Sequence, residues 1–288
     1  MKALLFHNPT AGEGDWPAER ARECVRRAGA QHEYVSTSED GWREQLGQPW
    51  PLVVAAGGDG TVEKVACGIR GHEAPIAILP TGGSNNLARL FGAGLFEGML
   101  NGSGADVCEL PLHVASATWP GGAQDFIESV GVGLVADVGI DGRKLNDRDE
   151  KREVGRRRLI DGLRDPRTVR ASVTIDGEPM TEPALMVEVM NIGMVGPNLM
   201  LAPGFDPAER RLSVVWVPLE AREAMLDWLR DPDASEAPVR QAKADRVVLT
   251  LDGEAMHVGD DVYEGIEGDV RVARKEGALR VLVPGVEP

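Results

Sequence analysis

An apolar run that passes directly into a glycine-rich turn constrains this chain more than any other feature of its sequence. Residues 53–56 (VVAA) predict a buried strand, residues 57–61 (GGDGT) predict a turn, and residues 62–69 predict a helix. Glycine permits positive φ and lets backbone N–H groups approach a ligand closely. Because a helix N-terminus attracts negative charge, the pattern predicts a phosphate-binding turn that contains an acid, Asp59. An ordinary strand-to-helix turn of an α/β domain is the alternative.

Two further apolar strands end in turns of the same kind. Residues 3–7 lead into 8–12 (NPTAG), and residues 76–80 lead into 81–86 (TGGSNN). The spacing and the missing lysine distinguish the 57–61 turn from the dinucleotide-binding G-x-G-x-x-G and from the G-x-x-x-x-G-K-[ST] loop. In open parallel sheets, ligands bind at the carboxyl ends of the strands near the switch point. The three loops therefore predict one ligand site at that edge of a sheet.

The chain is long enough for two domains, with 288 residues. Over residues 1–106, short apolar strands alternate with helical stretches, which predicts an α/β domain with a doubly wound, mostly parallel sheet. Over residues 107–275, short strands with turn signals predict a β-rich sandwich or barrel with one helix at 220–230. Asp176-Gly177 and Asp252-Gly253 follow apolar runs and predict hairpins or tight turns.

The net charge, the lengths of the apolar runs and the cysteine spacing argue against several classes of function. A net charge of −15 argues against nonspecific binding to nucleic acid and against broad adhesion to an anionic membrane. No apolar run reaches the length of a bilayer-spanning helix, and the first residues lack the pattern of a secretory signal. The three cysteines lack metal-site spacing and predict reduced, partly buried thiols. We expect a cytoplasmic protein whose membrane contact, if any, is local and peripheral.

One segment is strongly basic. Residues 143–158 contain eight Lys or Arg side chains: Arg143, Lys144, Arg148, Lys151, Arg152, Arg156, Arg157 and Arg158. Acidic residues interleave most of them, so a solvated helix with paired charges is the favoured interpretation. The alternative is a basic edge that meets lipid headgroups or a substrate phosphate.

These motifs, in this order, resemble the bacterial diacylglycerol-kinase-like lipid kinases, a group that includes sphingosine kinases and is related to NAD kinases. NPTAG resembles the opening N-P-x-[SA]-G, GGDGT resembles the glycine loop, and residues 80–89 resemble P-x-G-T-x-N-D-F-A-R. The C-terminal half is similar at residues 201–203 (LAP), 251–254 (LDGE) and 277–284. The resemblance implies an NAD-kinase-like nucleotide domain, a β-rich lipid domain, and a C-terminal segment, residues 276–288, that belongs to the first domain and contains the returning last strand over 279–283.

The resemblance also implies an activity, transfer of the γ-phosphoryl group of ATP, with Mg²⁺, to a hydroxyl of a neutral lipid such as diacylglycerol or a long-chain base. It implies nucleotide contacts at Asn8, Pro9, Thr10, Ala11, Gly12, Thr37, Gly57, Gly58, Asp59, Gly60, Thr61, Val62, Glu63, Gly82, Gly83 and Asn85. For Thr37, a helix cap before Glu39 and Asp40 is the alternative. Asp59 would lie near Mg²⁺ or the transferred group.

The acceptor base would come from the Asp252-Gly253-Glu254 turn. The resemblance implies Glu254 as proton acceptor, with Asp252 as the second choice. The same tripeptide at residues 176–178 is interpreted as a turn only. The hypothesis requires Asp59 and Glu254 to face each other across an interdomain gap.

Several positions depart from the family pattern. Lys64, Gly83 and Asn86 replace an acid, a threonine and an aspartate. Glu209-Arg210 stands where an Asp-Gly pair helps to hold a structural Mg²⁺, which leaves Glu209 as the candidate ligand and arginine in the place of glycine. Two alternatives stay open: a nucleotide-binding protein of this fold with little catalysis, and an NAD-kinase-type small-molecule kinase. A homodimer through an exposed edge of the second domain is a further expectation.

Overall fold

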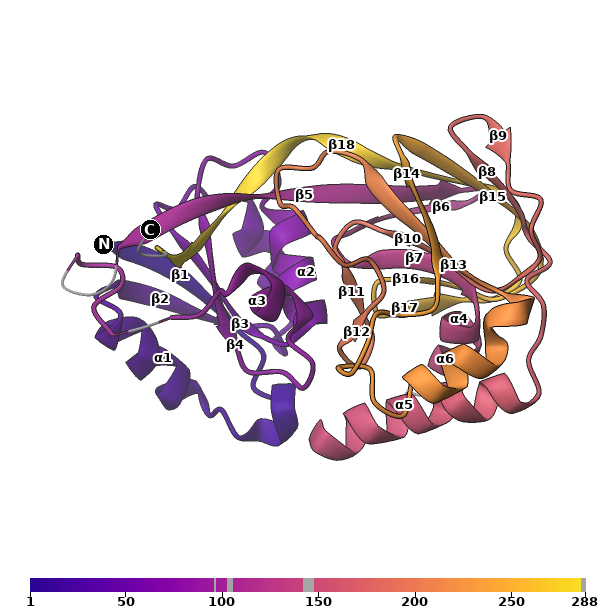
Figure 1. Cartoon of the computed structure of the whole chain (residues 1–288). Coiled ribbons are helices and arrows are strands. Elements are labelled where there is room, and N and C mark those ends of the chain that lie inside the picture. The colour runs from indigo at the N-terminus through magenta and orange to yellow at the C-terminus, as the bar shows by residue number, and fades with distance from the viewer. Residues whose placement is uncertain (96, 103–105, 142–147, 286–288) are drawn as a thin grey trace. The chain divides into compact units, whose positions relative to one another are not determined.

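The computed structural model describes residues 1–95, 97–102, 106–141 and 148–285 (Figure 1). The chain forms two compact units, which we call the N-terminal unit (Met1–Leu112 with Gly277–Pro288) and the C-terminal unit (His113–Glu276). The first boundary lies inside strand β5 (Val107–Trp119), whereas the sequence predicted it after residue 106. Strands β5 and β18 (Glu267–Pro284) each continue from one unit into the other, so turn signals do not mark the boundaries.

The N-terminal unit contains a parallel sheet in the order β2-β1-β3-β4-β18. Its other strands are β1 (Lys2–His7), β2 (Gln31–Ser36), β3 (Val53–Gly57) and β4 (Ile76–Pro80). The central strands are nearly continuous apolar runs because helices and loops cover both faces of such a sheet. At the end of β18, Val281 pairs with Ile76, which confirms the predicted return of the last strand.

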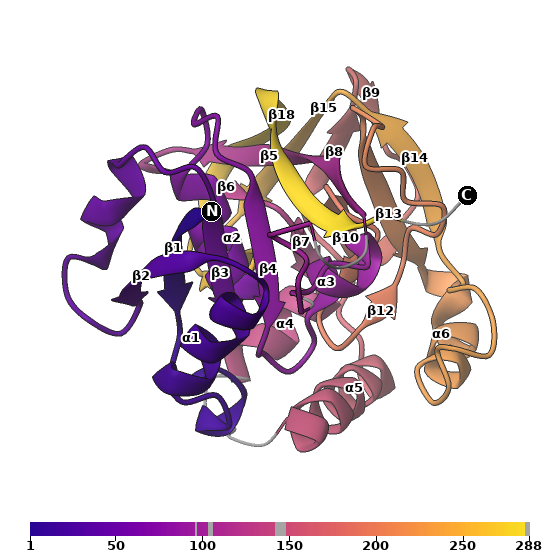
Figure 2. The same cartoon turned by 90° about the vertical axis from the view of Figure 1, so that its left-hand side faces the viewer.

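Short helices flank this sheet, which Figure 2 turns toward the viewer. They are α1 (Ala18–Arg27), α2 (Asp59–Gly68), α3 (Asn86–Phe91) and the 3₁₀ segments η1 (Ala11–Gly14) and η2 (Trp42–Gly47). On α1, Ala21 and Val25 pack in one apolar cluster with Leu5 and Val54. Helix α2 starts at Asp59, so the second half of the predicted 57–61 turn is its first helical turn.

The C-terminal unit is a β-sandwich, as predicted. One sheet has the order β14-β13-β10-β7-β16-β17, and the other contains β15, β8 and β9 with β18, β5 and β6. The strands are β6 (Gly122–Phe126), β7 (Ser129–Gly133), β8 (Ser172–Ile175), β9 (Glu178–Pro179), β10 (Ala184–Met190), β13 (Leu212–Pro218), β14 (Arg240–Ala244), β15 (Arg246–Asp252), β16 (Met256–Val258) and β17 (Asp261–Tyr263), with a separate pair β11 (Met194–Val195) and β12 (Leu199–Met200). Phe126, Val187, Leu249 and Val272 belong to the core that both sheets share.

Helices pack on the other face of the six-stranded sheet. They are α4 (Leu134–Asp141), α5 (Arg148–Arg164) and α6 (Arg222–Trp228), the last preceded by the 3₁₀ turn η4 (Leu219–Ala221). Leu163 of α5 and Leu226 of α6 join Met186 of β10 in a second apolar cluster. The helix predicted at 220–230 is confirmed, and α4 was not predicted. A bilayer-spanning helix is not found among residues 1–95, 97–102, 106–141 and 148–285.

Candidate functional site

The three predicted loops meet at the carboxyl end of the N-terminal sheet. Asn8, after β1, donates from Nδ2 to Thr61 Oγ1 at 3.2 Å in the first turn of α2. The backbone N–H of Thr81, after β4, donates to Gly57 O at 3.0 Å. Because parallel strands end at the same edge of a sheet, successive strands deliver all three loops to one place. The sequence prediction that these loops converge is therefore correct.

Two glycines allow the second and third loops to approach each other. A Cβ added to Gly82 would lie 2.2 Å from the Cα of Gly58, and backbone cannot yield at that distance. Asn85 closes the third loop, since its Oδ1 accepts from Gly82 N at 3.0 Å and its Nδ2 donates to Gly82 O at 2.8 Å. Asn85 adopts φ of 52°, a left-handed conformation that asparagine tolerates better than most residues. The loop is thus held in one shape by its own side chain.

Asp59 joins the second loop to helix α3. Its Oδ1 accepts from the backbone N–H of Leu87 at 3.1 Å, in the first turn of that helix. The first N–H groups of a helix have no partner inside the helix, so a carboxylate there satisfies one of them and meets the positive end of the dipole. Asp59 is half-buried. The predicted catalytic acid therefore also positions the third loop.

The opening loop is built around Asn8. Its Oδ1 accepts from both the backbone N–H and the hydroxyl of Thr10, at 3.1 and 2.8 Å. Gly12 takes φ of 58° inside η1, while Pro9 and Ala11 are half-buried. This loop presents an exposed threonine beside an asparagine that is already bonded to the α2 turn.

Other predicted nucleotide contacts differ in exposure. The side chains of Val62 and Glu63 are buried on α2, at 2% and 5% exposure, and the N–H of Val62 bonds to Gly58 O. Their contact with nucleotide stays a prediction, as do those of the half-buried Gly83 and Gly60. Lys64 is exposed on α2, and Asn86 is buried at the start of α3.

Thr37 follows β2 at the same edge of the sheet. Its N–H donates to His7 O at 2.8 Å and its hydroxyl to the same oxygen at 3.3 Å. The alternative of a helix cap is wrong, because the next helical segment is η2, which begins at Trp42 after Gly41. Thr37 thus lies next to the start of the opening loop, at His7.

The predicted acceptor base lies in the C-terminal unit. The Asp252-Gly253-Glu254 turn follows β15 and leads the chain to β16 in the other sheet, so it is a tight turn and not a hairpin. Oε2 of Glu254 accepts from Arg170 N at 3.1 Å, whereas its buried Oε1 has no hydrogen-bond partner among the residues that the structure describes. Asp252 is exposed. One Glu254 oxygen is thus fixed and the other is unbonded.

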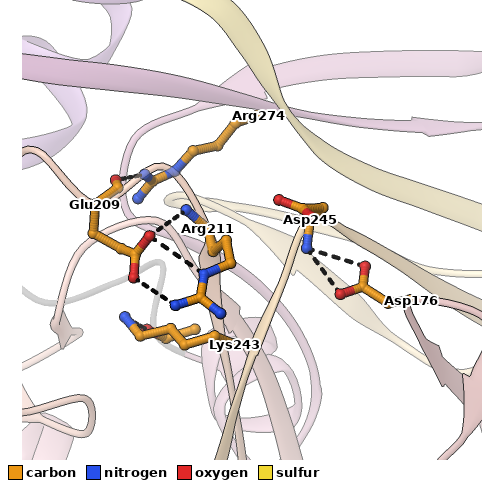
Figure 3. Close-up of polar contacts among 7 residues, drawn as sticks. Asp176, Glu209, Arg211, Lys243, Asp245 and Arg274 are labelled. Carbon is orange, nitrogen blue, oxygen red and sulfur yellow. Dashed lines mark hydrogen bonds and ion pairs between the residues drawn. The ribbon is translucent and has the colours of Figure 1, made fainter.

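The second copy of this tripeptide is a turn, as predicted. Asp176 and Gly177 have φ of 49° and 92° and connect β8 to β9. The Asp176 carboxylate accepts from the N–H of Asp245, at 3.0 and 3.2 Å to its two oxygens (Figure 3), and from the N–H of Arg246 at 2.8 Å. The Asp176 carboxylate therefore holds the backbone of Asp245 and Arg246 in place.

Glu209 does not fit a structural Mg²⁺ ligand. Its Oε1 accepts from the N–H and Nε of Arg211, at 3.1 and 3.4 Å, and its Oε2 accepts from Nη2 at 3.2 Å (Figure 3). The backbone N–H and then the guanidinium of Arg211 lower the pKa of Glu209 to about 2. Both oxygens are therefore engaged by one arginine. Within the described residues, no three His, Cys, Asp or Glu side chains are grouped to hold a metal.

A second arginine binds the backbone of the same residue. Arg274 Nη1 donates to Glu209 O, while its Nε and Nη2 donate to Asn191 Oδ1 and Asn191 O at 2.7 and 2.8 Å (Figure 3 shows the Glu209 contact). Asn191 Nδ2 in turn donates to His113 O and Ile127 O, at 2.8 and 2.9 Å. Burial lowers the pKa of Arg274 to about 10. The positively charged group here is therefore the Arg274 guanidinium, which donates to neutral oxygens of Asn191 and Glu209.

A buried pair of ionisable side chains, Glu188 and His257, was not predicted from the sequence. Glu188 and His257 are 0% and 4% exposed, and His257 Nε2 lies 2.9 and 3.0 Å from the two Glu188 oxygens. Gly131 lies between them in the sheet, and a Cβ there would be 2.3 Å from Glu188 Oε1. The sequence did contain an indication of this pair. Residues 184–190 (ALMVEVM) form an apolar run with a single glutamate, and a glutamate buried in such a strand requires a partner.

The described part of the basic segment belongs to helix α5, and among its described basic side chains Arg157 forms an ion pair, so the interpretation of a charge-paired face stays a prediction for the others. Arg157 pairs with Glu153 at 2.9 Å and Arg164 with Asp161 at 2.6 Å, all exposed, while Leu163 is buried. Arg143 and Lys144 lie outside the described residues, as do the side chains of Arg148, Lys151 and Arg152. Cys24 and Cys67 are half-buried cysteines that form no disulfide among the described residues, as predicted, whereas Cys108 is exposed.

Residues 2–104, which carry all three loops, match the family model of the diacylglycerol kinase catalytic domain. The predicted family resemblance is confirmed. A candidate diacylglycerol kinase structure from Bacillus anthracis strain Sterne has a TM-score of 0.73 at 21% identity, covering 99% of this chain and 95% of that one. A diacylglycerol kinase structure from the same strain has a TM-score of 0.69 at 20% identity, covering 99% and 97%.

An NAD kinase from Archaeoglobus fulgidus, solved in complex with ATP, has a TM-score of 0.52 at 13% identity, covering 100% and 94%. The comparison with curated proteins gives no match. At these identities the structural likenesses show the fold, an α/β unit followed by a β-rich unit, shared with diacylglycerol kinase and NAD kinase structures. The diacylglycerol kinase match over the loops supports a kinase of this family.

Proposed function

We propose that the protein is an ATP-dependent lipid kinase that phosphorylates a hydroxyl of a neutral lipid, such as diacylglycerol or a long-chain base. The observation that carries the proposal is the convergence of three loops within the segment that matches the diacylglycerol kinase catalytic domain. Phosphoryl transfer is catalysed mainly by positioning and charge stabilisation, and a rigid cradle of backbone N–H groups suits that task.

The loops would bind the triphosphate of ATP. The close approach of Gly58 and Gly82 leaves no room for a side chain on Gly82, so the backbone of these two loops lies close together, and Thr10 of the opening loop is exposed. Mg²⁺, when bound with ATP, offsets the charge of the phosphates. Asp59 is the residue that we propose to lie near this ion, because it is the acid of the second loop and its position is fixed by Leu87 N–H.

Glu254 is the residue that we propose as the acceptor base. The lipid hydroxyl oxygen bonds to the γ-phosphorus, the bond from that phosphorus to the β–γ bridging oxygen breaks, and ADP leaves with the electron pair. The hydroxyl proton passes to the Glu254 carboxylate. Support comes from the state of its two oxygens, since Oε2 is oriented by Arg170 N–H and Oε1 has no partner. Asp252 is the second choice.

A cytoplasmic protein with transient contact at a membrane surface fits a lipid acceptor. The net charge of −15 disfavours broad adhesion to anionic lipid, so we propose that the membrane contact is local. The same charge disfavours binding to nucleic acid, so we propose no such role. A homodimer remains part of the proposal.

A nucleotide-binding protein with little catalysis is the second candidate. The observations that favour it are the buried neutral Asn86 and the exposed Lys64, which replace two acids of the family pattern. Loss of acids near the phosphates weakens Mg²⁺-dependent chemistry more than it weakens phosphate binding.

The decisive experiment is incubation with labelled ATP, Mg²⁺ and a panel of neutral lipids, with NAD as a parallel acceptor. Labelled lipid supports the proposal. Labelled NAD phosphate would establish an NAD-kinase-type activity instead. ATP-dependent thermal stabilisation without any labelled product would favour the second candidate.

A further inference from the structure

An open pocket of about 700 Å³ lies between α1 and β2 of the N-terminal unit. Its lining includes Arg22, Arg26, Ala30, His32, Glu33 and Tyr34. The volume is within the range of small-molecule sites. None of these residues belongs to the three nucleotide loops, so the pocket is a separate feature.

The backbone of β2 supplies hydrogen-bond donors to this pocket. Gln31 N donates to Met1 O at 2.9 Å and Thr37 N donates to His7 O at 2.8 Å, so every second N–H of β2 points toward β1. The intervening N–H groups of His32 and Tyr34 point the other way. On that side, away from β1, β2 has no neighbouring strand in the part of the chain that the structure describes, so its outer edge is unpaired.

Arg22 forms no ion pair among the described residues, although its charge acts on the Glu19 carboxylate, which is bonded to Arg26. Its guanidinium lies over the Tyr34 ring, 4.2 Å from the centroid, and its Nε is buried without a hydrogen-bond partner. The neighbouring Arg26 differs, because it pairs with Glu19 at 2.5 Å and with Glu23 at 2.8 Å. The positive charge of Arg22 is therefore available to a ligand.

The charges of Arg22 and Arg26 act on His32. Burial lowers the pKa of His32 and the charges of Arg26 and Arg22 lower it further, whereas a hydrogen bond with the Ala30 backbone and the charge of Glu19 act in the opposite direction with less effect. Its Nδ1 is also buried without a hydrogen-bond partner. Glu33 lies between His32 and Tyr34 in the strand, so its side chain points to the opposite face of the sheet.

We propose that this pocket binds a phosphate group, as inorganic phosphate or as a soluble phosphate monoester, through the Arg22 guanidinium and the N–H groups of His32 and Tyr34. A planar guanidinium and backbone N–H groups are the donors that recognise phosphate oxygens elsewhere in proteins. The negative charge offsets the unpaired Arg22. The proposal does not rest on the proposed kinase function, since it concerns none of the loop residues.

The test is an NMR titration of the histidine ring signals with inorganic phosphate at constant ionic strength. Phosphate in the pocket shifts the His32 signals saturably and raises the pKa of His32 by about one unit, because an opposite charge nearby favours the imidazolium. His72, which does not line the pocket, is the internal control. Glycerol 3-phosphate is the second arm, and it separates a monoester ligand from the free ion.

Two variants on the same helix sharpen the test. Arg22→Gln removes the unpaired charge and weakens phosphate binding at His32 about tenfold or more. Arg20→Gln is the matched control, because Arg20 stacks on Trp16 outside the pocket, and it leaves the titration unchanged. Either a linear, unsaturable His32 response or an equal response in Arg22→Gln overturns the proposal. Equal binding of acetate overturns its assignment to phosphate.

Discussion

At the scale of single residues, Asp59 combines two roles that a substitution can separate. Its carboxylate accepts the Leu87 N–H at 3.1 Å, which holds α3 and the third loop, and it is also the charge that we propose near Mg²⁺. An asparagine at this position keeps an oxygen acceptor of the same size and loses only the charge. Alanine loses both.

We predict that Asp59→Asn changes the free energy of unfolding by less than about 1 kcal/mol, whereas Asp59→Ala lowers it by about 1–2 kcal/mol. Both variants lose at least about a hundredfold in phosphoryl transfer. Urea denaturation and turnover of labelled ATP measure the two effects. Near-normal turnover in Asp59→Asn would remove Asp59 from the chemistry and leave it as a helix cap.

A substitution of Glu254 can likewise separate its contact with Arg170 from its proposed catalytic role. The second Asp-Gly-Glu tripeptide of the chain, at residues 176–178, provides the control. Glu254→Gln still accepts the Arg170 N–H but cannot take a proton, so we predict a loss of about 10²–10⁴ in turnover and an unchanged fold. Glu178→Gln changes the same tripeptide in the β8–β9 turn and should be silent. Turnover and thermal unfolding are compared for both variants. Equal activity in the two would refute the assignment of Glu254 as base.

At the scale of elements, the predictable parts are those in which local sequence and burial agree. Strands β3 and β10 lie where apolar runs placed them, because a strand buried on both faces must be continuously apolar. Helix α4 was missed because the apolar, glycine-spaced stretch 130–138 fits a strand as well as a buried helix. The start of α2 was placed too late because Asp59 and Gly60 are poor helix formers whose conformation the loop contacts decide.

For the site, local motifs predicted the three loops, but long-range contacts could not be read from them. The Glu188–His257 pair and the Arg274–Asn191 contacts join residues far apart in the chain, 69 and 83 positions respectively. Pairings of that kind depend on strand order and register, which short motifs do not specify.

The Arg274 contacts tie β18 to segments around Asn191 and Glu209, and no metal is needed for this. We predict that EDTA changes the midpoint of thermal unfolding by less than about 2 °C.

We also predict that Arg274→Lys lowers the free energy of unfolding by about 2–4 kcal/mol, because lysine leaves buried oxygens unbonded. Arg271→Lys, an exposed change in the same strand, is the control and should cost under about 1 kcal/mol. Calorimetry with and without EDTA checks both. Strong destabilisation by EDTA would show that a structural metal binds after all.

At the scale of the whole molecule, three buried or half-buried histidines give the pH dependence of stability two opposite components. His7 and His32 lie in the N-terminal unit, and burial lowers the pKa of each. The unfolded chain binds protons at these positions more readily, so their contribution is lost as pH falls below about 6.5.

His257, in the C-terminal unit, has the opposite sign. Burial by itself lowers its pKa, but the charge of Glu188 and the hydrogen bond to it raise the pKa by more. Its Nδ1 lies 3.2 Å from Gly259 O and its Nε2 lies against the Glu188 carboxylate, both of which only accept hydrogen bonds, so both nitrogens carry protons. A folded pKa above the unfolded value of about 6.5 means that this contribution is complete below that pH. It is lost as pH rises through the folded value.

We therefore predict that wild-type protein loses stability as pH rises above about 6.5, and that His257→Gln flattens this decline while lowering stability at pH 6. Urea unfolding at several pH values measures the slope, and His72→Gln, at a half-buried histidine of the N-terminal unit, is the substitution control. His32→Gln should instead flatten the loss on the acid side, since its pKa is shifted in the other direction. An unchanged alkaline slope in His257→Gln would mean that the pair with Glu188 does not hold a proton at neutral pH.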